Sequence, residues 1–348
     1  MGKRFTRNQL RKISRQINAN PIAIDDLEVL FEQFSDTSDE AKIDLAWKKF
    51  GMFREYEGKN VITFFTTKGG VLKTTLAYNF ARIAALSGVK TIVLGLDMQC
   101  DITNCISGDE ESEHDSLKTA LEKLSLRNGL TQFFNRQCSL EEIIYPTDLA
   151  LLSYVPESPD LTLLNDSISL LNRREFWLKE KVINPILEEF DMVIIDCSPN
   201  WNRLTTNALC ASDLLVSPVE CKINNFKNIE VYQELIGQVK EDMFLSFNTC
   251  YVPTRFCANK KLSREIHQWY KNNLQGCCEG FIRESIESEE AIALQKSIVE
   301  YHPTSKVSSD MLQVVGEICK LLGKNNKEIY GPIYSNKTKG TNQHGFIS

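Results

Sequence analysis

One short segment constrains this chain more than any other: the run TTKGGVLKTT, from Thr66 to Thr75. The apolar run VITFF (61–65) precedes it and the segment TTLAYNFARIAAL (74–86) follows it, which predicts a buried strand, a glycine turn and a helix in succession. Gly69 and Gly70 allow a tight turn whose N–H groups converge, and the helix N-terminus adds unpaired N–H groups and a positive dipole end. The sequence therefore predicts a phosphate-binding loop.

The side chains after the glycines have the chemistry that a nucleotide needs. Lys73 is expected to place its ammonium on the β- and γ-phosphates. Thr74 should offer its hydroxyl to Mg²⁺, with Thr75 near the α-phosphate. The cofactors expected are therefore ATP and Mg²⁺. The loop residues predicted to bind the nucleotide are Lys68, Gly69, Gly70, Val71, Leu72, Lys73, Thr74 and Thr75.

The loop departs from the common spacing GxxxxGK[ST]. Thr67 stands in place of its first glycine and Leu72 in place of its last. The form present is xKGGxxK[ST], with a second lysine, Lys68, five positions before Lys73. This variant resembles the ParA/MinD group of P-loop ATPases. The resemblance implies that Lys68 reaches across a dimer to the partner's nucleotide.

Apolar runs alternate with longer amphipathic segments over the middle of the chain, which predicts an α/β fold. We expect a mainly parallel, doubly wound sheet of the P-loop NTPase type with helices on both faces, plus a small N-terminal helical extension. The predicted units are an extension over 1–58, an ATPase domain over 59–325 and a flexible tail over 326–348. The predicted strands are 61–66, 91–96, 192–196, 214–219 and 244–252, and the predicted helices are 74–87, 173–190, 204–211, 228–240 and 262–273.

Composition excludes several classes of protein. Of 348 residues, 42% are hydrophobic and 25% are charged, which argues against wholesale disorder. The net charge of −6 argues against wholesale coating of nucleic acid, although it leaves room for a local basic face. No apolar run approaches the ~20 residues of a membrane span, and the basic start lacks the apolar core of a secretory signal. The eleven cysteines are expected to be reduced thiols of a cytoplasmic protein.

Two further strands end in acids that belong to such a site. The strand TIVLGL leads to Asp97, in a motif that resembles the DxDPQ of ParA proteins, and the resemblance implies that Asp97 orients the attacking water. Gly95 replaces the first aspartate of that motif and Met98 its proline, so a lost carboxylate predicts slow hydrolysis or altered metal handling. The strand of the run FDMVIIDCSP delivers Asp196 to the sheet edge, where it is expected to hold Mg²⁺ through water. The predicted catalytic residues are Lys68, Lys73 and Asp97, and the predicted metal ligands are Thr74 and Asp196.

The resemblance to ParA proteins continues to about residue 325. The segments PTRF (253–256) and LSRE (262–265) resemble a PTR…LSRE stretch of the family, which places Pro253 and Arg255 at the nucleotide. The resemblance implies a DNA-partition ATPase of the cytoplasm and nucleoid. Its ATP-bound homodimer would bind DNA non-specifically, and a ParB-like centromere-binding protein would stimulate hydrolysis. The candidate DNA-binding residues are Arg255, Lys260, Lys261, Arg264, Lys296 and Lys306.

Three alternatives share the loop. A membrane-cycling regulator of the MinD kind needs a basic amphipathic C-terminal helix, and the polar, glycine-containing end of this chain argues against one. An iron–sulfur reductase needs paired cluster cysteines, and Cys100 and Cys138 lack the expected surroundings. An ATP-binding regulator or repressor with little hydrolysis would accord with Leu72, Gly95 and the basic start of the chain.

Overall fold

The computed structural model describes residues 59–107, 127–226 and 228–322. The extension predicted over 1–58 and the tail predicted over 326–348 lie outside the described residues. No helix among the described residues is long and apolar enough to cross a membrane.

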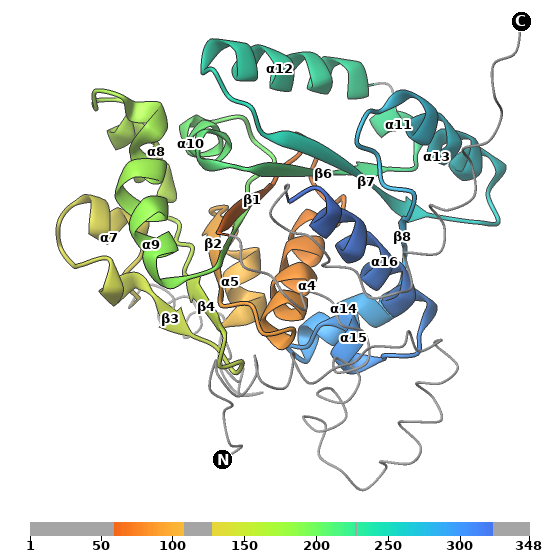
Figure 1. Ribbon diagram of the computed structural model, residues 1–348, viewed down its shortest axis with the longest axis horizontal. Coiled ribbons are helices and arrows are strands. Elements are labelled where there is room, and N and C mark those ends of the chain that lie inside the picture. The colour runs from red at the N-terminus through yellow and green to blue at the C-terminus, as the bar shows by residue number, and fades with distance from the viewer. Residues whose placement is uncertain (1–58, 108–126, 227, 323–348) are drawn as a thin grey trace, which may run out of the picture.

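Eight strands form one sheet in the order β3-β4-β2-β5-β1-β6-β7-β8 (Figure 1). Every neighbouring pair is parallel except β3 and β4, which pair antiparallel at one edge. The strands are β1 (Asn60–Phe64), β2 (Thr91–Leu96), β3 (Tyr145–Pro146), β4 (Leu152–Val155), β5 (Met192–Cys197), β6 (Leu214–Glu220), β7 (Asn248–Phe256) and β8 (Ile282–Arg283).

Helices cover both faces of this sheet. On one face, below the sheet in Figure 1, are α4 (Lys73–Leu86), α5 (Asp101–Ile106), α14 (Ile286–Ala293), α15 (Ile298–Tyr301) and α16 (Lys306–Lys320). On the other are α7 (Leu130–Phe134), α8 (Leu161–Ile168), α9 (Asn184–Glu189), α10 (Arg203–Ala211), α11 (Ile223–Phe226), α12 (Ile229–Asp242) and α13 (Lys261–Asn273). Short 3₁₀ turns occupy Glu141–Ile143 and Arg174–Phe176, and a π-helical turn occupies Lys179–Ile183.

The central strands are buried on both faces, as the continuous apolar runs predicted. In β1, Ile62 and Phe64 face the core under α4, and Val61 faces the core under α10. Strand β5 alternates in the same way, with Ile194 on the first side and Ile195 on the second. Successive side chains of a strand point to opposite faces, so these two runs supply both hydrophobic cores.

The predicted fold class is confirmed for the sheet and its helices, with two local corrections. The strand predicted over 244–252 begins only at Asn248, because Phe244 has a φ of 54° and is 95% exposed in a turn after α12. The single α-helix predicted over 173–190 is instead a 3₁₀ turn, a π-helical turn and the short helix α9 in succession. Pro185 lacks the N–H that a continuous helix would need there, which accounts for the π-helical turn just before it.

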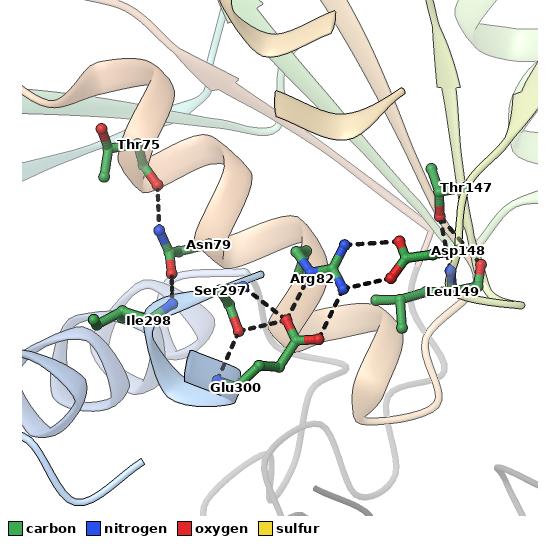
Figure 2. Close-up of polar contacts among 9 residues, drawn as sticks. All are labelled: Thr75, Asn79, Arg82, Thr147, Asp148, Leu149, Ser297, Ile298 and Glu300. Atoms are coloured by element: carbon green, nitrogen blue, oxygen red, sulfur yellow. Dashed lines mark hydrogen bonds and ion pairs between the residues drawn. The ribbon is translucent and has the colours of Figure 1, made fainter. Parts of the chain in front are cut away.

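Helix α4 is anchored far from the glycine loop by buried polar contacts (Figure 2). Asn79 accepts a hydrogen bond from the backbone N–H of Ile298 at 2.7 Å, at the start of α15. Arg82, which is 1% exposed, donates two hydrogen bonds to Glu300 and two to Asp148, all between 2.6 and 2.8 Å. These contacts tie the helix that follows the loop to α15 and to the β3–β4 turn.

Candidate nucleotide-binding site

The glycine loop joins β1 to α4 at the carboxyl edge of the sheet. Its backbone is left-handed at two positions, Gly70 with a φ of 71° and Leu72 with a φ of 67°. Glycine adopts such a conformation freely, whereas a leucine there is strained. Leu72 is also the N-cap of α4 and offers no side-chain hydrogen bond to the helix, so the first N–H groups of α4 stay available to an anion.

Lys73, Thr74 and Asp196 come together from α4 and β5. The Lys73 ammonium lies 2.6 Å from Asp196 Oδ1 and 3.3 Å from Thr74 Oγ1. The Thr74 hydroxyl donates to Asp196 Oδ2 at 2.7 Å. Burial would lower the pKa of Lys73, but the charge and hydrogen bond of Asp196, together with the neighbouring charge of Asp97, raise that pKa overall, so the lysine stays cationic. The predicted phosphate-binding lysine therefore contacts both predicted magnesium ligands, and its ammonium occupies the place between them.

Asp97 follows β2 beside this group and is 7% exposed. Its carboxylate accepts the N–H of Gln99, and its own N–H donates to Glu157 Oε1 at 3.1 Å. Glu157, just beyond β4, is 1% exposed and also accepts both the N–H and the hydroxyl of Thr103. Burial, together with the charge of Asp196, raises the pKa of Glu157 to about 8.

The oxygen atoms at this edge suit a divalent cation. Three buried carboxyl groups, on Asp97, Asp196 and Glu157, accompany the single buried ammonium of Lys73. Carboxyl oxygens are ligands that Mg²⁺ prefers. No group of three or more metal-ligating side chains is gathered within the described ranges. This arrangement fits a Mg²⁺ held by one or two side chains, with the remaining ligands from water and phosphate.

Lys68 stands apart from the buried lysine. Its ammonium pairs with Glu220 Oε2 at 2.5 Å, at the end of β6, and its side chain is 36% exposed. Glu220 also binds Lys222 at 2.8 Å, and its Oε1 lies 3.8 Å from Arg255 Nε. Burial opposes ionisation of Glu220, but its hydrogen bonds to Lys222 and Lys68 lower its pKa. Lys68 is thus held at the rim of the site by a carboxylate shared among three cations.

The predicted residues Pro253 and Arg255 lie near the loop on β7. Arg255 has a φ of 51°, donates from Nε to the carbonyl of Gly70 at 2.8 Å, and pairs with Glu284. Pro253 is buried within the strand. These contacts place Arg255 against the phosphate loop itself.

The other predicted DNA-binding residues come from two separate parts of the chain. Lys260, Lys261 and Arg264 are exposed at the start of α13, whereas Lys296 precedes α15 and Lys306 begins α16. Figure 1 shows α13 and α15 well apart. The predicted DNA-binding residues therefore form two separate basic groups, one at α13 and one near α15 and α16. Their role in DNA binding stays a prediction.

A family model described as an AAA domain, AAA_31, matches residues 59–248, which is 190 of the 348 residues. The chain belongs to this family. The match begins at β1 and ends at the first residue of β7, so it includes the glycine loop, Asp97 and Asp196.

Relatives refine the assignment to ParA-type partition ATPases, which confirms the resemblance seen in the sequence. The chromosome partitioning protein ParA of Myxococcus xanthus is 30% identical over 185 residues, which span 53% of this chain but only 60% of that protein. The structure of apo McdA from Cyanothece has a TM-score of 0.62 at 16% identity, over 76% of this chain and 99% of that one.

A third similar protein carries ligands. Cobyrinic acid a,c-diamide synthase of Mycobacterium smegmatis, with bound ATP analog and magnesium, has a TM-score of 0.56 at 23% identity. The alignment covers 68% of this chain and 91% of that chain. At these identities, the two structures support the fold of this chain.

Sequence reasoning missed two acidic residues of the site. Glu157 follows Pro156 after a short strand that was not predicted, so no motif drew attention to it. Glu220 directly follows the strand predicted over 214–219, but its partner Lys68 is 152 residues away. The glycine at position 95 was the one available signal, because it left room for a carboxylate from elsewhere.

Proposed function

We propose that this protein is an ATP-dependent DNA-partition ATPase that hydrolyses ATP to ADP and phosphate at the β1–α4 loop. Residues 59–325 would form the ATPase domain, with the segments on either side as accessory parts. The ATP-bound form is a homodimer that binds DNA without sequence preference. A ParB-like centromere-binding protein stimulates its hydrolysis, and the protein cycles on and off the nucleoid in the cytoplasm.

One observation carries this proposal: the convergence of Lys73, Thr74 and Asp196 on one buried cation position beneath the glycine loop. Catalysis of phosphoryl transfer depends mainly on positioning and on neutralising charge. Lys73 would exchange its contact with Asp196 for the β- and γ-phosphates. Mg²⁺, when bound, neutralises phosphate charge, and Thr74 and Asp196 are the side chains that would hold it. Asp97 would orient the water.

The position of Lys68 supports the proposed dimer. Its partly exposed ammonium is paired with Glu220 at the rim rather than buried beneath the loop. A lysine in that place is able to reach a nucleotide held by a second copy of the chain once it leaves Glu220. ATP would then stabilise the dimer because each triphosphate supplies an acceptor for the partner's lysine.

DNA binding is assigned to the cations at the start of α13 and near α15 and α16. Contacts between such cations and phosphates give affinity that is independent of sequence and falls as salt rises. Coupling to ATP requires that the dimer bind DNA better than the monomer does. Two copies joined at the nucleotide would present twice the number of basic positions to one duplex.

The decisive experiment is fluorescence anisotropy of a labelled random-sequence duplex with ATP, with ADP and without nucleotide, at two salt concentrations. We expect tight, salt-sensitive binding with ATP alone. The variant K260A/K261A should weaken binding several-fold and reduce its salt dependence. A control is K179A/K181A on the π-helical turn, away from α13, which should bind DNA like the wild type.

Other outcomes would select the alternatives. Binding that does not depend on nucleotide, with preference for an operator sequence, would favour the ATP-binding regulator. Loss of DNA binding in every nucleotide state, with binding to anionic vesicles in ATP, would favour the membrane-cycling ATPase. Either result would overturn the partition proposal.

A further inference from the structure

Gly95 lies at a crowded position in the middle of the site. It is on β2 directly opposite Asp196 of β5 in the strand register. A Cβ atom added at Gly95 would lie 2.1 Å from Cγ, 2.3 Å from Cδ and 2.5 Å from Oε1 of Glu157. No side chain fits there while Glu157 keeps its place. Position 95 is therefore glycine because another residue fills its side-chain space.

The group that fills this space is a carboxyl. In an aspartate, the carboxyl carbon is one bond, about 1.5 Å, beyond Cβ. The Glu157 carboxyl carbon is 2.3 Å from the position of that Cβ. An aspartate at position 95 would thus direct its carboxyl group into the volume that the Glu157 carboxyl occupies. Glu157 and an aspartate at position 95 would therefore place a carboxyl group in the same volume.

Glu157 is also fully engaged with the catalytic edge. Its Oε1 accepts the N–H of Asp97 at 3.1 Å, and its Oε2 accepts the N–H and the hydroxyl of Thr103, each at 3.1 Å. The Thr103 hydroxyl accepts the N–H of Glu157 in return at 2.8 Å. Glu157 thereby joins the end of β4, the end of β2 and helix α5. Burying a carboxyl group is costly, and these hydrogen bonds offset part of that cost and fix the position of Glu157.

We propose that Glu157 supplies from the end of β4 the carboxyl group that the second phosphate-site motif lacks at Gly95, and that it is the positioning residue for Asp97. This inference rests on the proposed ATPase function. On this proposal the site is not short of a carboxyl group at Gly95, so the slow hydrolysis expected from Gly95 would not follow. Glu157 touches Asp97 through the backbone, so it fixes where the Asp97 carboxylate stands without itself contacting the water.

The test is a double-mutant cycle that moves the carboxylate from one strand to the other. E157A should lower kcat at least tenfold and leave the KM for ATP within about threefold, because the phosphate loop is untouched. G95D alone should also lose activity and lower Tm, because its side chain collides with Glu157. The double variant G95D/E157A should recover kcat to within about threefold of the wild type, since an aspartate accepts the N–H two residues onward.

A matched control separates the carboxylate from relief of the collision. G95A/E157A removes Glu157 and adds a Cβ at position 95 but supplies no carboxylate. It should stay as inactive as E157A, and its Tm should be lower than that of G95D/E157A. If E157A does not fold, E157Q replaces it in the comparison with the wild type and should lower kcat at least fivefold at similar KM.

Three results would overturn the inference. The first is a wild-type kcat in E157A or E157Q, and the second is equal activity in the two double variants. The third is a rise in the KM for ATP as large, in fold-change, as the fall in kcat. Failure of the proposed function has a different signature, because the wild type itself would not hydrolyse ATP. In that case the Tm values decide. A higher Tm for G95D/E157A than for G95A/E157A supports one shared carboxylate position, and equal values reject it.

Discussion

The two ends of helix α4 each hold one buried cation, and they hold it in different ways. At the start of the helix, Lys73 contacts one oxygen of Asp196 and the hydroxyl of Thr74. Nine residues later, Arg82 makes four hydrogen bonds to two carboxylates. A lysine is a compact charge on a flexible stem, whereas the arginine fork matches carboxylates in a fixed geometry.

The contact of Lys73 must be exchanged when a nucleotide binds, whereas the contacts of Arg82 must persist. Lys73 has few partners to leave when phosphates become available. Arg82 commits four of its five N–H donors to Glu300 and Asp148. Glu300 in turn accepts the N–H and hydroxyl of Ser297 in a capping box at the start of α15 (Figure 2). We infer that α4 is anchored at its far end so that its first turn can change partners without the helix moving.

Removing the anchor should have the largest effect. R82M leaves Glu300, whose side chain is 4% exposed, without its cation, and we expect a loss of about 3–5 kcal/mol in the free energy of unfolding. Urea denaturation without ligand measures this loss. Affinity of the remaining folded protein for a fluorescent ATP analogue should change less than about twofold.

A surface arginine serves as the control for that variant. The side chain of Arg173 is 72% exposed and pairs with Glu180, so R173M should stay within about 0.5 kcal/mol of the wild type. A loss below about 1 kcal/mol in R82M would show that the far end of α4 is no anchor.

Removing the cation at the other end should affect binding more than stability. K73M should weaken ATP binding by about 100-fold or more, which corresponds to about 2.7 kcal/mol. Its stability should fall less than that of R82M, because burial already raises the pKa of Asp196 and a proton can take the place of the ammonium. Titration with the same ATP analogue tests the first expectation and urea denaturation the second.

Lys68 provides the matched control within the same loop. K68A should bind ATP within about threefold of the wild type but lose ATP-dependent dimerisation. Binding of ATP by K73M within tenfold of the wild type would break the comparison between the two ends of α4.

Releasing Lys68 from its carboxylate should have a smaller, opposite effect. E220Q removes the charge that holds Lys68 at the rim, so dimerisation should require less ATP by up to about fivefold, the size expected for a partly exposed ion pair. Sedimentation velocity across an ATP series measures the midpoint. E265Q, which breaks the exposed pair with Lys261 on α13, is the control and should leave it unchanged. An unchanged or higher midpoint in E220Q would argue that Lys68 is not restrained by Glu220.

The parts of the molecule that sequence reasoning predicted are those encoded by neighbouring residues. The glycine loop, the start of α4 and the buried strands β1, β2, β5 and β6 follow from runs of ten residues or fewer. The short strands β3 and β4 were missed because two to four residues carry too little pattern.

The features that sequence reasoning did not predict depend on contacts between residues far apart in the chain. Lys68 and Glu220 are 152 residues apart, and Arg82 and Glu300 are 218 apart, so no spacing rule links them. The position of Glu157 also could not be predicted. The loss of a carboxylate at Gly95 was visible in the sequence, but its replacement depends on how β4 ends beside β2, which only the sheet order reveals. The assignments of individual side chains to ATP, Mg²⁺ and DNA stay predictions.

The smallest effect concerns the strained residue between the two lysines. Leu72 adopts a φ of 67°, a conformation that costs a residue with a Cβ about 1–2 kcal/mol. L72G would relieve this cost, but glycine loses about 0.5–1 kcal/mol more backbone entropy on folding, and the half-buried leucine gives up about 1 kcal/mol of apolar contact. These contributions nearly cancel, so we expect stability within about 1 kcal/mol of the wild type.

Leu86 gives the matched control, because it is also half-buried against the same core but ends α4 in an ordinary helical conformation. L86G has no strain to relieve and should cost about 2 kcal/mol or more. The difference between the two variants in urea denaturation measures the strain at Leu72 directly. Equal losses would mean that the loop accepts a leucine at no cost. A smaller loss of stability in L72G than in L86G would show that backbone strain lies at Leu72, at the start of α4 where Lys73 exchanges partners. The far end of α4, which Arg82 anchors, would then carry no such strain.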